Sequence, residues 1–404
     1  EFKNNNIQNS IMEKVSFIQF LDTFKSKQEV LNYEYLKFIQ TVNADFYSNN
    51  YSNPQVVGYC PPMDETNKYN LWMCNNEVNL QLEDNRPEKL IDININTLKD
   101  LLQIINENEY DEQYKYNIDL KSLHNIKQEL ESLENMVGLE RIKSSILDQM
   151  LYFLQGLHNI GNGDYKHTIL YGPPGTGKTE IAKIMGKMYS KIGILKNNVF
   201  RKVTRSDLIA GYLGQTAIKT KKVVDECKGG VLFIDEVYAL GSQVDDDNYS
   251  KECIDTLCEA LSDNKDDLMV IVAGYEEEIN ERFLSRNNGL ESRFLWKFEM
   301  DKYTAKDLHT IFKRMVTLND WKYDEEIKES WFEKHFNDFG SYGRDIEKLF
   351  SHSKVVYGRR SYGKPDIVKQ MITLDDLNKG LDIFKQNKMK KNELPKYIHQ
   401  TLYC

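Results

Sequence analysis

The sequence predicts an α/β domain with a parallel sheet, followed by a helical lid domain and preceded by a separate N-terminal region that is mixed or mostly helical. Strand-like and helix-like segments alternate from residue 131 to 302, an order typical of a parallel sheet with helices on both faces. Apolar residues then recur at helical spacing from 303 to 387, so this lid is expected to be entirely helical. We expect residues 388–404 to form a tail.

The N-terminal region, residues 1–130, is less regular than the rest of the chain. Apolar residues recur at helical spacing within 11–21 and again within 98–105, and they alternate as in a strand within 78–82. Pro and Gly residues between 54 and 62 indicate a loop. No set of catalytic residues is evident here, and we hypothesise that the region recruits a partner.

Strands and lid helices can be placed from the apolar pattern. The strands are expected at 167–171, 198–204, 230–235, 268–273 and 294–300. The lid helices are expected at 304–317, 324–336, 343–357 and 374–385, with Thr304 and Thr373 as N-caps. Ligands of such sheets bind at the carboxyl ends of the strands, so we expect the chemistry there.

The charge of the chain disfavours nucleic acid as a partner. The 53 Lys and Arg residues are outnumbered by 62 Asp and Glu residues, which gives a formal net charge of −9. No overall positive field would therefore attract a phosphate backbone. A local basic channel stays open as an alternative.

Cysteine usage and hydropathy indicate a reducing, cytosol-like compartment and no membrane span. The six cysteines form no C-x-x-C pair, which favours free thiols over disulfides or a zinc site. No apolar run approaches the roughly 18 residues of a membrane helix, and the N-terminus lacks a signal-peptide pattern. We expect a cytoplasmic protein, with an organelle or a host compartment left open.

A glycine-rich segment, GPPGTGKTE at 172–180, follows the first predicted strand and precedes a helical pattern. In that context it is a phosphate-binding loop, because its backbone N–H groups and the next helix surround a triphosphate. Lys178 is expected to act as a catalytic residue on the β and γ phosphates, and Thr179 to bind Mg²⁺. A plain surface turn is the alternative. The residues expected to bind ATP are Gly172, Pro173, Pro174, Gly175, Thr176, Gly177, Lys178, Thr179 and Glu180.

Two carboxylates, Asp235 and Glu236, directly follow the apolar strand at 231–234. Opposite a phosphate loop, Asp235 would hold Mg²⁺ and Glu236 would polarise the attacking water. A solvated strand end is the alternative. The glutamate favours hydrolysis, because a hydrolase must orient water, whereas a small-molecule kinase has to keep water out.

Several segments together carry a family resemblance. They are 205–217 (RSDLIAGYLGQTA), 229–240 (GGVLFIDEVYAL), 270–275 (VIVAGY) and 288–294 (NGLESRF). In order and spacing, the chain from about 134 to 385 resembles the CbbX/CfxQ and stage V sporulation protein K branch of AAA+ ATPases. The resemblance implies an ATP-hydrolysing ring, usually a hexamer, in which each ATP lies between two subunits.

The resemblance also implies a catalytic residue supplied by the neighbouring subunit. Arg293 is similar to the arginine finger that reaches the γ-phosphate across the interface. Many relatives have a second arginine where this chain has Glu291, and Arg286 is near enough in sequence to replace it. An exposed structural arginine is the alternative for Arg293.

Other positions resemble the family's nucleotide contacts. Arg344 is similar to the sensor 2 arginine of the lid, which couples lid position to the γ-phosphate; a surface salt bridge is the alternative. Val137 and Gly138 match the position where relatives contact adenine. The strand end at 273–275 lacks the Asn of many AAA+ proteins, so a water-positioning role there is open.

A glycine-flanked aromatic, Tyr212, is expected to contact substrate together with Leu213. Flanking glycines give a mobile loop, and the aromatic ring gives a large apolar grip. In the family this loop lines the central pore and pulls on polypeptide; a buried core tyrosine is the alternative. The second pore-facing segment, 242–247, is acidic and would repel a phosphate backbone.

These observations predict an ATP-driven motor that remodels a protein substrate. Its cofactors would be ATP and Mg²⁺. Its partners would be other copies of the chain, in the hexamer that the resemblance implies, and a protein client of unknown identity. An ATPase that acts on nucleic acid and a scaffold switched by ATP are the alternative hypotheses.

Overall fold

The computed structural model describes residues 86–160, 163–212, 214–241, 248–364 and 370–393, with side chains as far as 388. By their contacts, the described residues belong to one compact unit, which begins at Leu82. The predictions for 11–21, for the loop at 54–62, for 78–82, for Leu213, for the acidic segment 242–247 and for the end of the tail lie outside the described residues.

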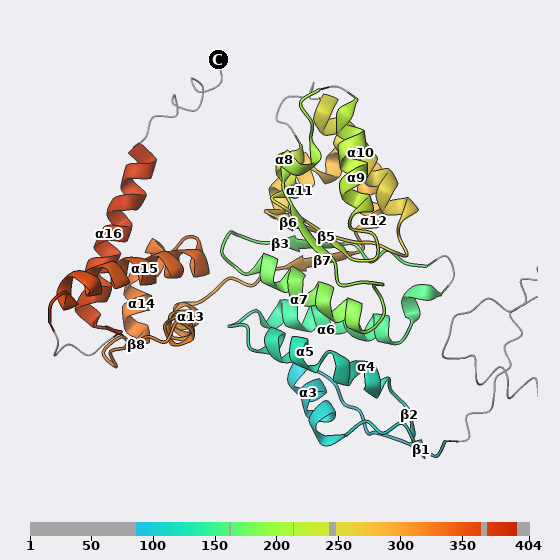
Figure 1. The fold of residues 1–404 in the computed structure, drawn as a ribbon, viewed down its shortest axis with the longest axis horizontal. Helices are drawn as coiled ribbons and strands as arrows, with labels where there is room; N and C mark the ends of the chain where they lie inside the picture. The colour runs from blue at the N-terminus through green and yellow to red at the C-terminus, as the bar shows by residue number, and fades with distance from the viewer. Residues whose placement is uncertain (1–85, 161–162, 213, 242–247, 365–369, 394–404) are drawn as a thin grey trace, which may run out of the picture. The chain divides into compact units, whose positions relative to one another are not determined.

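A parallel sheet forms the centre of this unit, as predicted, and its strand order is β4-β5-β6-β3-β7 (Figure 1). Its strands are β3 (Thr168–Tyr171), β4 (Phe200–Val203), β5 (Val231–Asp235), β6 (Met269–Gly274) and β7 (Trp296–Glu299). Asp235 pairs with Ala273 and Tyr171 with Gly274. The carboxyl ends of β5, β6 and β3 therefore finish at one edge of the sheet.

Alternate side chains of the strands bury the two faces of the sheet in separate cores. Phe233 lies in the core that α6 (Glu140–Leu154) and α7 (Lys178–Lys191) cover. Its neighbour Ile234 lies in the core under α9 (Gln215–Asp225) and α10 (Asn248–Asp263). Both faces are thus covered by helices, which explains why the strands read as continuous apolar runs.

Short helices complete the α/β part. They are η1 (Leu157–Asn159), α8 (Arg205–Leu208), η2 (Val237–Leu240), α11 (Glu276–Arg282), η3 (Leu284–Arg286) and α12 (Asn288–Arg293).

Helices from the expected N-terminal region share the core of the α/β part. They are α3 (Leu98–Glu107), α4 (Leu120–Asn125) and α5 (Lys127–Glu134), beside the short parallel pair β1 (Glu88–Lys89) and β2 (Lys115–Tyr116). α3 agrees with the helical pattern at 98–105. Leu101 and Leu130 are fully buried in the same core as Tyr189 of α7. Residues 98–130 thus lie in the same compact unit as the sheet, although the sequence assigned them to a separate region.

The C-terminal domain contains α13 (Ala305–Leu318), α14 (Glu329–His335), η4 (Phe336–Asp338), α15 (Tyr342–Ser361) and α16 (Leu374–Glu393). Thr304 and Thr373 accept hydrogen bonds from the backbone N–H groups of Asp307 and Asp376, as expected of N-caps. The expectation of an entirely helical domain is wrong. Here β8 (Lys322–Tyr323) pairs with β9 (Met371–Ile372), and α14 starts at Glu329, after β8 and later than the predicted start at 324.

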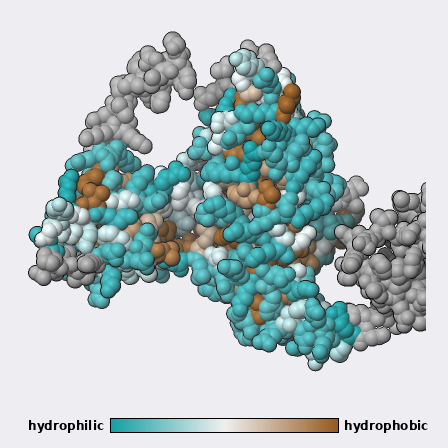
Figure 2. All heavy atoms as spheres, viewed as in Figure 1, coloured by the Kyte–Doolittle hydropathy of each residue, from teal (hydrophilic) through white to brown (hydrophobic). Residues whose placement is uncertain are grey.

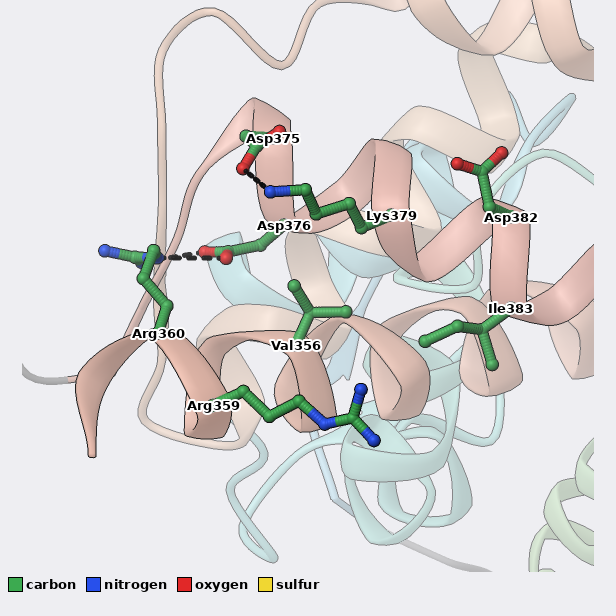
Figure 3. A pocket seen from close by; sticks show the side chains of 8 residues that line it. All are labelled: Val356, Arg359, Arg360, Asp375, Asp376, Lys379, Asp382 and Ile383. Carbon is green, nitrogen blue, oxygen red and sulfur yellow. Dashed lines mark hydrogen bonds and ion pairs between the residues drawn. The ribbon is translucent and has the colours of Figure 1, made fainter.

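An ion pair joins the two long lid helices (Figure 3). Arg360 of α15 donates two hydrogen bonds to the fully buried carboxylate of Asp376 on α16, at 3.0 and 2.7 Å. Beside it, Lys379 contacts Asp375 at 2.6 Å. These pairs line a cavity of about 520 Å³. Because acidic and basic side chains are paired across it, we infer that the pairs hold the two helices together and do not form a ligand site.

The surface is largely hydrophilic in the view of Figure 2, with apolar side chains scattered over it. Within the described part of the chain, no helix is both long enough and apolar enough to cross a membrane. Cys227, Cys253 and Cys258 are buried and free, as predicted for cysteines. Burial raises the pKa of the Cys253 thiol to about 11, so this thiol is unreactive at neutral pH.

Candidate nucleotide site

The phosphate loop leaves the end of β3 and enters α7 at Lys178. Gly175 and Gly177 have φ angles of +78° and +95°, which favour glycine. The buried Thr176 donates its hydroxyl to the carbonyl oxygen of Pro173 at 2.9 Å, which closes the turn. The first N–H groups of α7 are thereby presented at one point, as anion binding requires.

Lys178 is satisfied within its own loop. Its ammonium donates hydrogen bonds to the carbonyl oxygens of Gly172 at 2.7 Å and Pro173 at 2.8 Å. Burial lowers the pKa of Lys178 to about 8, while nearby Asp235 and Glu236 act in the opposite direction and Arg344 adds to the lowering. All three charges are therefore close enough to act on the loop lysine, and anionic phosphate between Lys178 and Arg344 would relieve their repulsion.

The two carboxylates lie at the end of β5, with β6 between them and β3. Asp235 is partly buried, and its Oδ2 accepts a hydrogen bond of 2.6 Å from Lys202 of β4. Glu236 is exposed and has a φ of +53°, an unusual backbone for a non-glycine residue. Such conformations concentrate at functional sites, where the surrounding fold holds them.

The lid touches the phosphate loop at two places. The backbone N–H of Gly343, at the start of α15, donates to the carbonyl oxygen of Gly175 at 3.2 Å. The hydroxyl of Tyr303, between β7 and α13, donates to the carbonyl oxygen of Thr176 at 3.1 Å. Arg344 follows Gly343 and is exposed, which leaves its guanidinium accessible to a ligand at the loop.

The segment around Val137 and Gly138 lies between the loop and the lid. A Cβ placed on Gly138 would be 3.4 Å from the carboxylate of Asp307 in α13, and one on Gly177 would be 3.0 Å from the methyl of Met136. Gly138 has a φ of +62°, so the backbone turns sharply before α6. Both residues are partly exposed at this junction.

Arg293 is held by its own chain at the end of α12. Its Nε donates to Ser262 Oγ at 2.7 Å, and a second nitrogen donates to the carbonyl oxygen of Gly289 at 2.5 Å. Glu291, on the same helix, is paired with Lys297 at 2.9 Å. Arg286 is exposed in η3. Among the described contacts, none joins Arg293 to the phosphate loop of the same chain.

The side chain of Tyr212 is 73% exposed, so the alternative of a buried core tyrosine is wrong. Gly211 and Gly214 have open space where a side chain would stand. Gly214 has a φ of +79° and directly precedes α9. The loop is thus exposed and backed by a helix.

Comparison with known proteins agrees with this geometry. The model of the AAA family, the ATPase family associated with various cellular activities, matches residues 168–296. A cfxQ-like protein of Acanthamoeba polyphaga mimivirus is 37% identical over 275 residues, which are 67% of this chain and 68% of that protein. The chain belongs to the CfxQ-like AAA ATPases. The predicted family is confirmed, and with it the binding and hydrolysis of ATP.

Other relatives of this CfxQ-like ATPase are longer. The ESX-3 secretion system protein EccA3 of Mycolicibacterium smegmatis is 37% identical over 227 residues, 54% of this chain and 34% of that protein. The chain thus spans about a third of that protein. The solved AAA domain of FIGL-1 in complex with ADP is 20% identical, with a TM-score of 0.46, and the match covers 64% of this chain and 88% of that one.

Two contacts of this CfxQ-like ATPase were not anticipated from its sequence. Lys202 touches the Asp235 carboxylate, and Tyr303 touches the phosphate loop. The first follows only once the strand order is known, because it joins the end of β4 to the end of the adjacent strand β5. The second has no local signal, because Tyr303 lies on an irregular connection.

Proposed function

We propose that this AAA ATPase works as an oligomeric motor that remodels a protein substrate. The observation that carries the proposal is the exposed aromatic side chain of Tyr212 on a glycine-flanked loop. The tyrosine ring offers a large apolar area with a polar hydroxyl at its tip, and it packs well against extended polypeptide of varied sequence. Leu213 is proposed to contact the substrate beside it.

The hydrolytic site is proposed to combine the loop with the β5 carboxylates. The Thr179 hydroxyl and the Asp235 carboxylate supply only oxygen atoms, and such a donor set fits Mg²⁺. When bound, Mg²⁺ would neutralise charge on the phosphates. Glu236 would orient the attacking water, and Lys178 with Arg344 would hold the phosphates.

No cluster of three or more His, Cys, Asp or Glu able to hold a metal occurs in the part of the chain that the structure describes. At the proposed site, phosphate oxygens and water would complete the ligands of Mg²⁺. Residues 172–180 would supply the backbone N–H groups for those phosphates, and Val137 and Gly138 would contact the base.

Assembly is proposed because one chain does not complete this site. Arg293 contacts Ser262 of α10 and Gly289 of α12, and no described contact joins it to the phosphate loop of its own chain. An arginine supplied by the next subunit would stabilise charge that develops on the transferred phosphoryl group. A hexameric ring is the arrangement that the family implies.

The test compares two exposed tyrosines. Tyr212→Ala should keep ATP turnover and lose ATP-dependent unfolding of a fluorescently labelled model protein that carries an unstructured tail. Tyr362→Ala, which changes an 89% exposed tyrosine of the lid, is the matched control and should keep both activities. Full unfolding activity in Tyr212→Ala would refute the role of this loop.

Nucleic acid as a substrate is the alternative, and the net charge of −9 weighs against it. ATP turnover that DNA or RNA stimulates, and that rising salt abolishes, would support this alternative over the first. A scaffold switched by ATP would bind nucleotide but release almost no phosphate.

A further inference from the structure

We propose that Lys202 is a built-in counter-ion of Asp235 which keeps cations away from this carboxylate until Mg²⁺ arrives together with nucleotide. The inference rests on the proposed role of Asp235 as the Mg²⁺ ligand. It adds a residue outside the loop and the β5 motif that controls when the metal binds.

The fold places Lys202 beside this carboxylate. Lys202 pairs with Phe233 across β4 and β5, and its ammonium lies 5.8 Å from the centre of the Phe233 ring. From there it reaches Asp235 Oδ2 at 2.6 Å. The Asp235 side chain is 24% exposed, so its carboxylate is partly shielded from water.

Other nearby cations are engaged elsewhere. Lys178 acts on Asp235 through space, but its ammonium is bonded to loop carbonyl oxygens. Arg205 donates to the carbonyl oxygens of Ala239 and Leu240. Lys202 is the cation that the described contacts place directly on the carboxylate.

The pair can open without disturbing the core. A cavity of about 670 Å³ lies beside it, lined by Lys202, Thr204, Ser206, Asp235, Glu236 and neighbouring residues. The Lys202 side chain is 45% exposed and can swing into this space. A divalent ion that arrives with a triphosphate is also held by phosphate oxygens, so it can displace one ammonium from Asp235. A bare divalent ion has to displace the ammonium without those ligands.

The free enzyme is therefore a poor divalent-ion site, and metal binding is tied to nucleotide binding. After hydrolysis and loss of phosphate, Lys202 returns to Asp235 and favours departure of the metal with the diphosphate. In this role Lys202 is a positioning residue, since it acts through Asp235 and not on the reacting atoms.

The experiment measures Mn²⁺ binding to the full chain without nucleotide, by the loss of the free-ion EPR signal. Lys202→Met should bind Mn²⁺ at least tenfold more tightly than wild type, and the charge-preserving Lys202→Arg should match wild type. At saturating ATP, Lys202→Met should also reach half-maximal turnover at lower Mg²⁺. Unchanged or weaker Mn²⁺ binding in Lys202→Met would overturn the proposal.

Asp235→Asn separates this inference from the proposed site. If Asp235 is not the metal ligand, Asp235→Asn will leave Mn²⁺ binding in the presence of a non-hydrolysable ATP analogue unchanged, and the site assignment fails. If Asp235→Asn weakens that binding while Lys202→Met changes nothing, only the role of Lys202 fails. Thermal unfolding checks each fold, and Lys202→Gln replaces Lys202→Met if the latter does not fold.

Discussion

The hydroxyl of Tyr303 donates a 3.1 Å hydrogen bond to the carbonyl oxygen of Thr176, which joins the start of the lid to the phosphate loop. Burial raises the pKa of Tyr303 to about 12, so the hydroxyl stays protonated and remains a donor at any working pH. The Tyr303 ring also meets the ring of Tyr342 edge to face at 5.7 Å. One side chain thus contacts both the loop and the first turn of α15.

Tyr303→Phe should weaken this connection without removing the ring. The buried carbonyl oxygen of Thr176 would lose its hydrogen-bond donor, which should lower the free energy of unfolding by about 1–2 kcal/mol. We expect that loss in urea unfolding, together with weaker protection of the lid by ATP in hydrogen exchange. Tyr362→Phe is the control, since that hydroxyl is exposed. Equal stability of the two variants would show that the bond contributes nothing.

Gly175→Ala and Gly193→Ala form a matched pair, because both glycines have a positive φ, +78° and +80°. A Cβ at Gly175 would lie 2.0 Å from the carbonyl oxygen of Ser341, whereas one at Gly193 meets nothing within 4 Å. Both changes should cost about 1–2 kcal/mol for the backbone. Only Gly175→Ala should also push the lid from the loop and weaken ATP binding tenfold or more, as measured with a fluorescent ATP analogue.

If Gly193→Ala weakened nucleotide binding equally, the contact of loop and lid would not explain the result. The loss would then reflect general destabilisation of the domain by a left-handed alanine.

The sheet could be predicted from sequence because each strand is buried on both faces. Such a strand appears as a short apolar run, and the predicted strand at 230–235 became β5 at Val231–Asp235. The pair β8 and β9 could not be predicted, since two-residue strands have no periodicity. Periodicity also predicted the α3 helix but could not show which core it would join.

The candidate site also has a part that could be predicted from the sequence and a part that could not. The loop at 172–180 and the pair Asp235 and Glu236 are contiguous in sequence, so their patterns are visible. Lys202 and Asp235 are 33 residues apart, and Tyr303 and Thr176 are 127 apart. Contacts at that range depend on strand order and lid packing, which a single sequence does not encode locally.

Nucleotide binding should depend on pH through Lys178. Burial lowers the pKa of this ammonium to about 8 in the nucleotide-free protein. A bound triphosphate favours the charged form and raises that pKa, so ATP binding takes up a proton above pH 8. Affinity should fall as pH rises through 8, by up to tenfold per pH unit. Calorimetry in buffers of different ionisation enthalpy measures the proton uptake.

The control for this pH dependence is Lys178→Arg, whose guanidinium stays charged throughout. Its affinity should be lower but nearly flat between pH 7 and 9.5. The same slope in both proteins would exclude Lys178 as its source.

We expect Arg293 to be required for hydrolysis of the ATP bound by the neighbouring subunit, and not of the ATP bound by its own subunit. Arg293→Ala is expected to lower kcat at least a hundredfold, because the charge on the transferred phosphoryl group loses its stabiliser. Ser262→Ala removes one contact that holds Arg293 within its chain and should keep full turnover.

Mixing Arg293→Ala with Lys178→Ala subunits tests whether Arg293 acts across the interface or within its own chain. A mixed interface can pair an intact loop with an intact arginine, so phosphate release should recover to a clear fraction of wild type. If the mixture stays as inactive as its components, Arg293 acts within its own chain.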